Sequence, residues 1–338
     1  MINQNEHVLE ISVIIIAYNR KDYLIQAVQS AINQQFDREK YEIIVVKNFT
    51  DPDIDHFLNV NGVKNIFSSN ISIGSKFTEG IRSARGEIIC LLEDDDIFLP
   101  NKLDVVYAVF LRNPNLCYYH NNAGFIDGSG NIMNNFDTVS TRKIKRVGEM
   151  YVKADEKEKK VFRLFDIGSY WNNSCICIRK SFYTKYLDTL SRIKTFFDGA
   201  IFYSALISDG DIIITPETLT YYRINSVSAT QSAKLDSVNH FNISIKNIDD
   251  NLVISQMLER EKGRFRVSQR LMIEKASWEI KSIIYNESSN RAEAIKYLYR
   301  MLTKREITLA FFKSNLLPLS GLLLFIISPK LSRKSRIA

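Results

Sequence analysis

The amino-acid sequence predicts an α/β fold, in which a doubly wound, mostly parallel β-sheet is followed by an α-helical C-terminal extension. Short apolar runs alternate with helical apolar spacing through the first third of the chain, an order that builds parallel sheets with right-handed crossovers. Strand-like runs stop beyond Ser228, where helical spacing continues. The 338 residues, 45% of them hydrophobic, suffice for one large or two ordinary domains.

The individual elements follow from local patterns. Ile11–Ala17 is a continuous apolar run, which is typical of a strand buried on both faces. Asp51-Pro52 predicts a helix start, because aspartate caps helices and proline fits their first turn. The carboxyl ends of parallel strands face the ligand crevice, so the loops that follow them should converge. The patterns predict strands over 11–17, 42–46, 63–67 and 87–92, helices over 24–32, 51–58 and 74–84, and converging loops at 18–20, 47–49 and 93–96.

Four consecutive carboxylates, Glu93 to Asp96, follow the fourth predicted strand, and Pro100 then opens a helix over 101–113. Adjacent carboxylates repel one another, so holding them together favours a bound cation. Aspartate oxygens at this edge suit a hard divalent cation whose free positions bind a diphosphate. The alternative is a solvated acidic turn. The sequence has no glycine-rich phosphate loop, which disfavours a Walker or dinucleotide-binding site.

Several segments resemble the inverting glycosyltransferases of family two, in the right order and spacing from residue 11 to about residue 103. Weaker family-like features continue to Ser228 and include Tyr221-Tyr222-Arg223. The resemblance implies a GT-A fold that binds a nucleotide-diphosphate sugar together with Mg²⁺ or Mn²⁺. The matching segments are Ile11–Arg20, Gln29–Gln34, Glu42–Val46 and Ala84–Ile89, the last leading into the acidic run.

The resemblance also implies roles for single residues. Tyr18 would pack by the base, Arg20 would lie near the diphosphate, and one carboxylate of the acidic run would bind the ribose. Asp95, supported by Asp96, would bind the metal ion. For Tyr18 and Arg20 the alternative is a helix-capping loop with a solvated cation. The residues implied to bind the nucleotide sugar are Ala17, Tyr18, Arg20, Asn48, Lys76, Glu93 and Asp94.

The sequence departs from the family pattern after the second strand, where paired aspartates are usual and Lys47-Asn48 stands instead. A lysine has only donors and cannot accept the imide proton of uracil, whereas the amide oxygen of Asn48 can. Asn48 as a simple turn residue is the alternative. The departure leaves uridine, thymidine and guanosine open as the nucleoside of the donor.

Phe197-Asp198 precedes an apolar helical run at the point where the family usually has Glu-Asp. The resemblance implies that Asp198 is the general base, because inversion requires the acceptor hydroxyl to lose its proton as it attacks the anomeric carbon. The alternative is that Asp198 is the N-cap of the helix.

The rest of the middle third carries weaker patterns. Thr138–Arg163 mixes cations and acids without clear periodicity, so we expect a solvated loop, with a lid over the donor as the alternative. His120 is expected to pack at a strand end, and Trp171 to be a buried aromatic or the wall of a sugar site. A further strand is predicted over 173–178.

The C-terminal part is expected to be helical and to end at a membrane surface. Leu316–Ile327 is apolar but shorter than the ~20 residues that a span needs, and Lys330–Arg336 carries four cations. This combination fits an in-plane helix on an anionic leaflet; a helix packed on the protein's own core or a homodimer contact is the alternative. The expected parts are a nucleotide-sugar-binding half (1–122), an acceptor-binding half (123–230), a helical extension (231–303) and an apolar helix with a polybasic tail (304–338).

The sequence therefore predicts a metal-assisted inverting glycosyltransferase that acts on a glycan or lipid-linked glycan. One alternative is a nucleotidyltransferase. The other is a catalytically degenerate nucleotide-sugar-binding protein, which stays open because Lys47 and Phe197 depart from the family pattern. The net charge is +7, but the basic residues are not interleaved with aromatic residues on a predicted sheet. No nucleic-acid partner is therefore expected. A polar start and four cysteines without CxxC spacing predict a cytoplasmic protein, peripheral on the inner face of the membrane.

Overall fold

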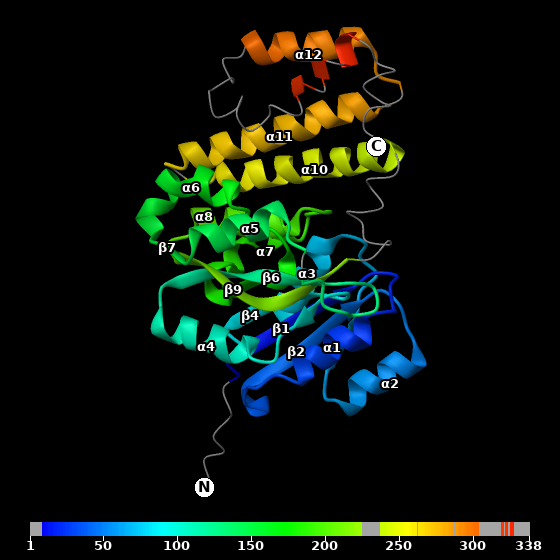
Figure 1. Ribbon diagram of the computed structural model, residues 1–338, viewed down its shortest axis with the longest axis vertical. Helices are drawn as coiled ribbons and strands as arrows, with labels where there is room; N and C mark the ends of the chain where they lie inside the picture. Colours follow the sequence, from blue (N-terminus) through cyan, green and yellow to red (C-terminus); the bar gives the residue numbers. More distant parts are fainter. Residues whose placement is uncertain are drawn as a thin grey trace. The chain divides into compact units, whose positions relative to one another are not determined.

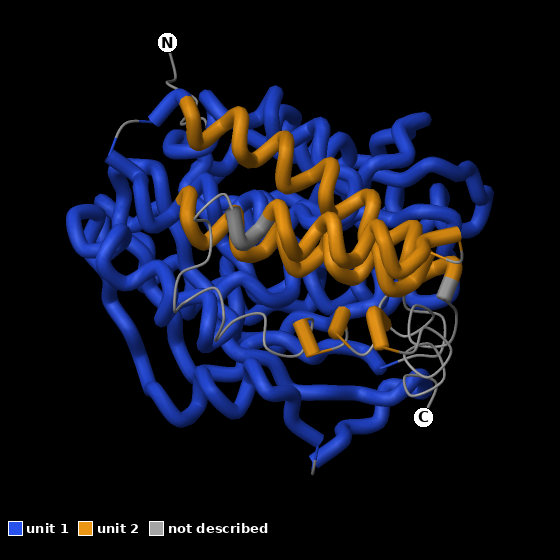
Figure 2. Tube along the Cα trace, turned by 90° about the horizontal axis from the view of Figure 1, so that it is seen from above, with its two compact units in different colours: residues 1–224, 260–267 blue, residues 225–259, 268–338 orange. Residues whose placement is uncertain are grey.

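The computed structural model describes residues 9–134, 136–224, 237–261, 263–286, 288–303, 319–320, 322–323 and 325–327. The chain forms two compact units, which Figure 2 colours separately. Unit 1 comprises residues 1–224 and 260–267, and unit 2 comprises residues 225–259 and 268–338. Unit 1 holds the β-sheet and carries every residue that the sequence predicts for the active site.

Unit 1 is built on one sheet, which in the described residues has nine strands in the order β3-β2-β1-β4-β8-β6-β9-β5, with β7 paired to β9 (Figure 1). The first four strands of this order are parallel, which confirms the predicted βαβ alternation. These strands are β1 (Ile11–Ala17), β2 (Tyr41–Lys47), β3 (Lys64–Phe67) and β4 (Ile88–Glu93).

The other half of the sheet makes it a mixed sheet. Strand β8 runs antiparallel to both β4 and β6, β9 is parallel to β6, and β5 and β7 are antiparallel to β9. The expected division after residue 122 falls within β6, so both halves of the expected transferase domain share this one sheet. The strands are β5 (Ile97–Phe98), β6 (Leu116–Ile126), β7 (Met150–Val152), β8 (Ile176–Arg179) and β9 (Asp211–Arg223).

Helices cover both faces of the parallel strands, because successive side chains of a strand point to opposite faces. On one face Val13 and Ile15 join the apolar residues of α1, α2 and α4 in a single core. On the other face α3 approaches closely, since a Cβ on Gly80 would lie 2.4 Å from Cγ2 of Ile14. The helices of unit 1 are α1 (Leu24–Ile32), α2 (Pro52–Val60), α3 (Ile73–Ser83), α4 (Lys102–Arg112), α5 (Val139–Val147), α6 (Lys157–Asp166), α7 (Leu187–Leu190) and α8 (Phe197–Ile207).

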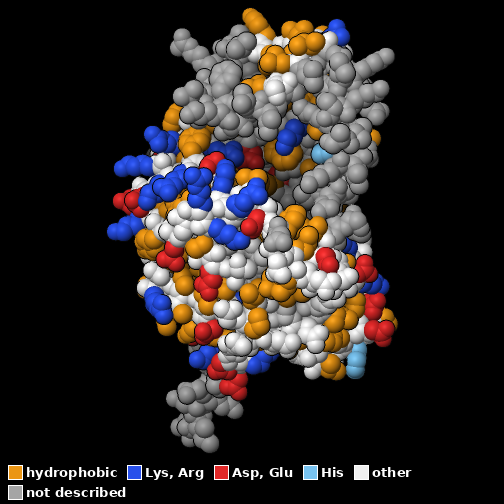
Figure 3. All heavy atoms as spheres, in the orientation of Figure 1, with side chains coloured by type: hydrophobic (Ala, Val, Ile, Leu, Met, Phe, Trp, Pro, Cys, Tyr) orange, Lys and Arg blue, Asp and Glu red, His pale blue; other side chains and the backbone are white. Residues whose placement is uncertain are grey.

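The expectation of a solvated loop over Thr138–Arg163 is wrong. This segment forms α5, β7 and most of α6, because each helix buries apolar side chains, among them Ile144 in α5 and Val161 in α6. Lysine and arginine side chains of these helices gather on the surface (Figure 3). The predicted strand over 173–178 is shorter than expected, because residues 173–175 form a 3₁₀ turn, η3 (Asn173–Cys175), before β8.

Unit 2 is helical, as the sequence predicts. Its helices are α10 (Ser237–Leu258), α11 (Phe265–Tyr285, whose first turn belongs to unit 1) and α12 (Arg291–Thr303). The rings of His240 and Tyr285 stack between α10 and α11 with centroids 4.4 Å apart, and the Tyr297 hydroxyl of α12 bonds Glu279 of α11.

The C-terminal membrane prediction concerns residues that lie largely outside those described. Within the described residues, no helix is both long and apolar enough to cross a bilayer. The polybasic residues Lys330–Arg336 are not described, so their role stays a prediction.

Candidate active site

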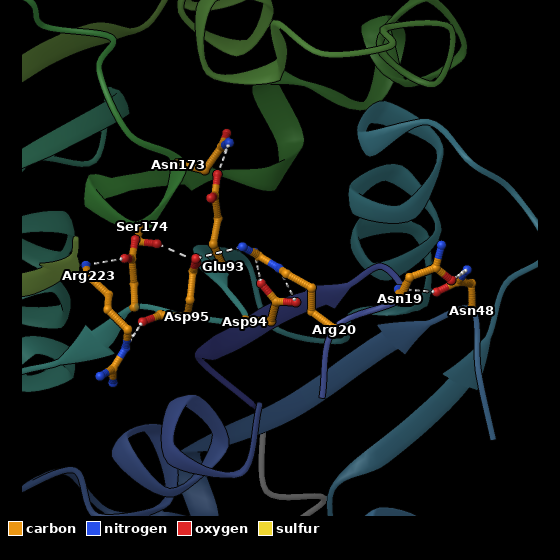
Figure 4. Close-up of polar contacts among 10 residues, drawn as sticks. Asn19, Arg20, Asn48, Glu93, Asp94, Asp95, Asn173, Ser174 and Arg223 are labelled. Carbon is orange, nitrogen blue, oxygen red and sulfur yellow. Dashed lines mark hydrogen bonds and ion pairs between the residues drawn. The ribbon is translucent and has the colours of Figure 1, made fainter. Parts of the chain in front are cut away.

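The strand register brings the three expected loops together. Ala17 pairs with Lys47 on the neighbouring strand β2, and Ile16 pairs with Glu93 on β4. Beyond these ends Asn19 and Asn48 bond to one another: the Asn19 N–H donates to Oδ1 of Asn48 at 2.9 Å, and Nδ2 of Asn48 donates to Oδ1 of Asn19 at 2.7 Å (Figure 4). Two hydrogen bonds therefore connect the loops after β1 and β2 at the edge where a nucleotide is expected.

Arg20 points at the acidic run. Its Nη1 lies 2.8 Å from Oδ2 of Asp95, and its Nε and Nη2 both bond the carboxylate of Asp94 (Figure 4). Although burial opposes the charge, the carboxylates of Asp94 and Asp95 raise the pKa of Arg20 above its usual value. A guanidinium held in this way is a fixed positive charge beside the expected diphosphate site.

The acidic run is buried, which makes its charge costly. Asp94, Asp95 and Asp96 are each less than 10% exposed. Burial raises the pKa of Asp94 to about 7 against the attraction of Arg20, and burial together with repulsion from Asp95 raises the pKa of Asp96 well above its usual value. Burial also raises the pKa of Glu93, despite a hydrogen bond from Asn173. Further positive charge at this run would relieve the repulsion.

The donor set at Asp95 and Asp96 suits a metal ion only in part. Oδ1 of Asp96 accepts the backbone N–H of Arg223, whereas Oδ2 is buried with no hydrogen bond from the described residues. The described part of the chain contains no group of three or more histidine, cysteine, aspartate or glutamate side chains arranged to hold a metal. Mg²⁺ is commonly held by one or two carboxylates and the phosphates of its substrate, so these residues fit an ion that arrives with a diphosphate.

Arg223 is almost fully buried and bonds the backbone of the acidic run. Its Nε donates to the backbone carbonyl of Asp95 at 2.8 Å, and its Nη2 donates to Oε1 of Gln26 in α1. Its guanidinium lies over the ring of Tyr23, 4.3 Å from the centroid. The last residue of β9 thus positions the backbone that carries Asp95 and Asp96.

Tyr18, expected beside the base, and Lys76, expected to bind the nucleotide sugar, contact each other. Tyr18 is 44% exposed, and the buried ammonium of Lys76 lies 4.4 Å from the centroid of its ring. Lys47, which stands where the family usually has an aspartate, is buried and engaged within the protein. It forms a 2.7 Å ion pair with Asp55 of α2 and bonds the carbonyl of Phe49.

A single turn connects the acidic run to the expected base. In η3 the Asn173 amide donates to Oε1 of Glu93 at 2.7 Å, and the Ser174 hydroxyl accepts the Glu93 N–H at 3.0 Å (Figure 4). The backbone N–H of Asn172 donates to Oδ2 of Asp198 at 3.4 Å. In the described chain, the non-glycine residues with positive φ are Asn19, in the loop after β1, and Asn172, in this turn. Such conformations cost free energy and concentrate at functional sites.

Asp198 is not the N-cap of its helix. The N-cap position of α8 is Phe196, and Asp198 is the second helical residue. The family's usual glutamate is replaced by Phe197, which is fully buried and stacks on Phe77 of α3 with ring centroids 4.8 Å apart. Of the residues Phe197 and Asp198, only Asp198 carries a carboxylate, and it accepts the N–H of Asn172.

Two aromatic residues considered for the sugar site pack against the protein: His120 is buried, and Trp171 is half-buried. His120 bonds the carbonyl of Trp171 through Nε2, and burial lowers its pKa to about 4, so its ring is neutral. The Trp171 ring lies against those of Phe125 and Tyr222. His120 packs inside the protein as expected, but it lies within β6 (Leu116–Ile126) and not at a strand end.

Sequence analysis missed three residues that organise the site. The Asn173 and Ser174 side chains lie in a stretch predicted as plain strand, and Lys102 lies in the helix predicted over 101–113. Lys102 is fully buried, and its Nζ donates to Oδ1 of Asn121, the carbonyl of Ser174 and Oγ1 of Thr220 at 2.6–3.0 Å. No local pattern marks these residues, since their partners are distant in sequence.

Comparison with known proteins identifies the family of this chain. Residues 12–182, about half of the chain, match the model of Glycosyl transferase family 2. The chain belongs to this family of glycosyltransferases. Its fold, a mixed sheet with helices on both faces and a helical C-terminal region, is the GT-A fold.

The matching relatives are distant in sequence. An uncharacterised glycosyltransferase of Nostoc sp. is 26% identical over 67% of this chain and 68% of its own length. Chondroitin synthase of Escherichia coli is 30% identical over 37% of this chain, and an uncharacterised glycosyltransferase of Rickettsia bellii is 28% identical over 39%. The chain aligns with about a fifth of the length of each of these two relatives.

Among solved structures, S. aureus TarS 1-349 in complex with UDP-GlcNAc is similar, with a TM-score of 0.60 at 12% identity. The match covers 97% of this chain and 89% of that chain. At this identity the similarity concerns the fold.

Proposed function

We propose that this protein transfers a sugar from a nucleotide-diphosphate donor to a hydroxyl group of a glycan or lipid-linked glycan, with inversion at the anomeric carbon. The observation that carries the proposal is the turn at residues 172–174. It contacts Glu93 at the end of β4 and Asp198 at the start of α8, so one turn joins the edge expected to bind the donor to the expected base.

The donor assignment is supported by the charge and the loops at the strand ends. Arg20 supplies a fixed cation for the diphosphate, and Tyr18 offers an exposed ring for the base. The similar protein TarS has been solved in complex with UDP-GlcNAc and with UDP. For a uracil base, the Asn48 amide has to exchange its bonds with Asn19 for bonds with the imide.

Asp95 and Asp96 would hold the Mg²⁺ or Mn²⁺ ion of this reaction. When bound, such an ion supplies positive charge to the departing diphosphate. Arg20 already contacts Asp95, so the ion would share this carboxylate with the guanidinium.

Asp198 would act as the general base. Its carboxylate takes the proton of the acceptor hydroxyl while the hydroxyl oxygen attacks the anomeric carbon from the face opposite the diphosphate. The Asn172 N–H bond at Oδ2 orients the carboxylate for this task. The acceptor becomes the glycoside, and the nucleoside diphosphate leaves.

A thermal-shift panel tests donor and metal binding together. UDP, TDP and GDP are added with and without Mn²⁺ to the wild type and to Asp95→Asn, because a ligand that binds the folded state raises the melting temperature. We expect one nucleotide to stabilise the wild type in a Mn²⁺-dependent way and to lose that dependence in Asp95→Asn. A wild type whose nucleotide binding and transfer are insensitive to a chelator contradicts the metal assignment.

The alternatives give different results. A catalytically degenerate binding protein, which the buried Phe197 keeps open, binds the nucleotide but turns over no donor. A nucleotidyltransferase would release pyrophosphate from a nucleoside triphosphate instead of a nucleoside diphosphate from a nucleotide sugar.

A further inference from the structure

Two neighbouring helices of unit 1 present a positively charged surface that the proposed reaction does not use. Segment 137–166 carries nine lysine and arginine residues against six aspartate and glutamate residues. Figure 3 shows the blue side chains gathered over this part of unit 1. We define the α5/α6 basic face by four exposed cations: Arg142 and Arg146 of α5, and Lys159 and Arg163 of α6.

The cations of this face are available to a partner. Arg142 and Arg146 are four residues apart, as are Lys159 and Arg163, so each pair lies on one side of its helix. None of the four has an ion-pair partner in the described parts of the chain, and α5 and α6 are tied together where Lys143 bonds Asp166 at 2.8 Å. Four exposed cations without ion-pair partners thus lie on two helices that the Lys143–Asp166 pair joins.

The nearby carboxylates only partly cancel this positive charge, and most are engaged. Asp137, Glu156 and Asp166 are each paired with a lysine, Lys145, Lys160 and Lys143 respectively. The Glu158 carboxylate is held by the backbone N–H groups of Arg266 and Val267 and keeps its charge, but the segment still carries three more cations than anions.

The composition of the face fits a soluble anionic polymer better than a lipid surface. A membrane-binding helix inserts large apolar side chains between its cations. In segment 137–166 the exposed large hydrophobic residues are Val139 and Tyr151, and the Tyr151 hydroxyl bonds Asp211. Few side chains of this face are therefore free to enter a bilayer.

The face also lies close along the chain to the expected base. Helix α6 ends at Asp166, and the N–H of Asn172 six residues later contacts Asp198. Six residues span at most about 20 Å. A chain molecule bound across α5 and α6 can thus extend to Asp198 within a few sugar units.

We infer that the α5/α6 basic face binds an anionic glycan polymer, one that carries phosphate, sulfate or carboxylate groups, and delivers its end to Asp198 as the acceptor. Polymer binding is inferred from the charges of the face and their exposure. The role of the polymer as acceptor rests in addition on the proposed function. Neutral glycans lack the charge that this face complements.

The test is the affinity for dextran sulfate, with neutral dextran as the comparison polymer, measured over a series of NaCl concentrations. The test variant is Arg142→Gln/Lys159→Gln/Arg163→Gln. The matched control is Lys40→Gln/Lys64→Gln/Arg112→Gln, which removes three exposed cations elsewhere on unit 1. Both variants lower the net charge equally, so a difference between them reports the place of the charges.

We expect the wild type to bind dextran sulfate and not dextran, and the test variant to bind at least ten-fold more weakly at low salt. The slope of log affinity against log salt should fall by roughly two, since each cation on a flexible polyanion contributes about 0.7. The control variant should keep wild-type affinity. Nucleotide-induced thermal shifts should be equal in all three proteins.

Equal affinity of wild type and test variant for dextran sulfate overturns the inference, and so do equal losses of affinity in the test and control variants. A test variant that keeps its affinity for the polymer but loses it for phosphatidylglycerol vesicles would make the face a membrane contact instead. Polymer binding without nucleotide binding would support the face while contradicting the proposed transferase.

Discussion

Replacing Asp94 by asparagine should stabilise the ligand-free protein at alkaline pH, because the native carboxyl is buried and resists ionisation. Asp94 is 3% exposed, and its pKa rises from an ordinary 3.8 to about 7. Asparagine has the shape of the protonated acid but never ionises. The substitution therefore removes the cost of the buried charge and leaves the packing unchanged.

The sign and size follow from proton linkage. Between pH 4 and 7 the native carboxyl keeps a proton that the unfolded chain releases, so the contribution of Asp94 to stability falls as pH rises through about 7. A pKa rise from 3.8 to about 7 corresponds to about 4 kcal/mol at pH 8, the attraction of Arg20 being included in that pKa. The difference between Asp94→Asn and wild type should be near zero at pH 4 and largest above pH 7.

The assay is urea unfolding in a chelator at pH 5, 6.5 and 8, followed by tryptophan fluorescence. The chain has two tryptophans, so a Trp278→Phe background leaves Trp171 to report on unit 1. Asp104→Asn on the exposed side of α4 is the control and should differ from wild type by less than about 0.5 kcal/mol at every pH. A stability difference for Asp94→Asn that is independent of pH, or a variant less stable than wild type at pH 8, would refute the reasoning.

Three further predictions concern the base, the sheet and the C-terminus. Asp198→Asn should lose on the order of 10²-fold or more in turnover with donor affinity unchanged, and near-normal turnover would reduce the residue to a structural role. Gly86→Ala should lower the free energy of unfolding by roughly 1–3 kcal/mol, because its Cβ would lie 2.5 Å from the Ile11 carbonyl carbon; Gly128→Ala, with ordinary contacts, is the control. Deleting residues 316–338 should release the protein from anionic vesicles and leave nucleotide binding unaltered; a truncated chain that fails to fold would assign the run to the core.

Local sequence patterns determined most elements of this fold. Continuous apolar runs predicted β1, β2 and β4, and they succeed because a strand buried on both faces requires such a run. Helical apolar spacing over 236–258, 265–284 and 291–302 predicts α10, α11 and α12 to within a residue or two. The acidic run was recognisable because repelling carboxylates at a strand end are unusual wherever they occur.

The tertiary structure decided the features whose partners are far apart in sequence. Helices α5 and α6 are short and heavily charged, so their few apolar residues make helices only when the sheet is there to bury them. The Lys102 ammonium meets acceptors 19, 72 and 118 residues away, and Arg223 meets Asp95 across 128 residues. The sequence by itself thus determined which strand ends carry the reactive groups. Only the folded sheet decided how they are oriented, because the hydrogen bonds that orient them join residues that no local pattern connects.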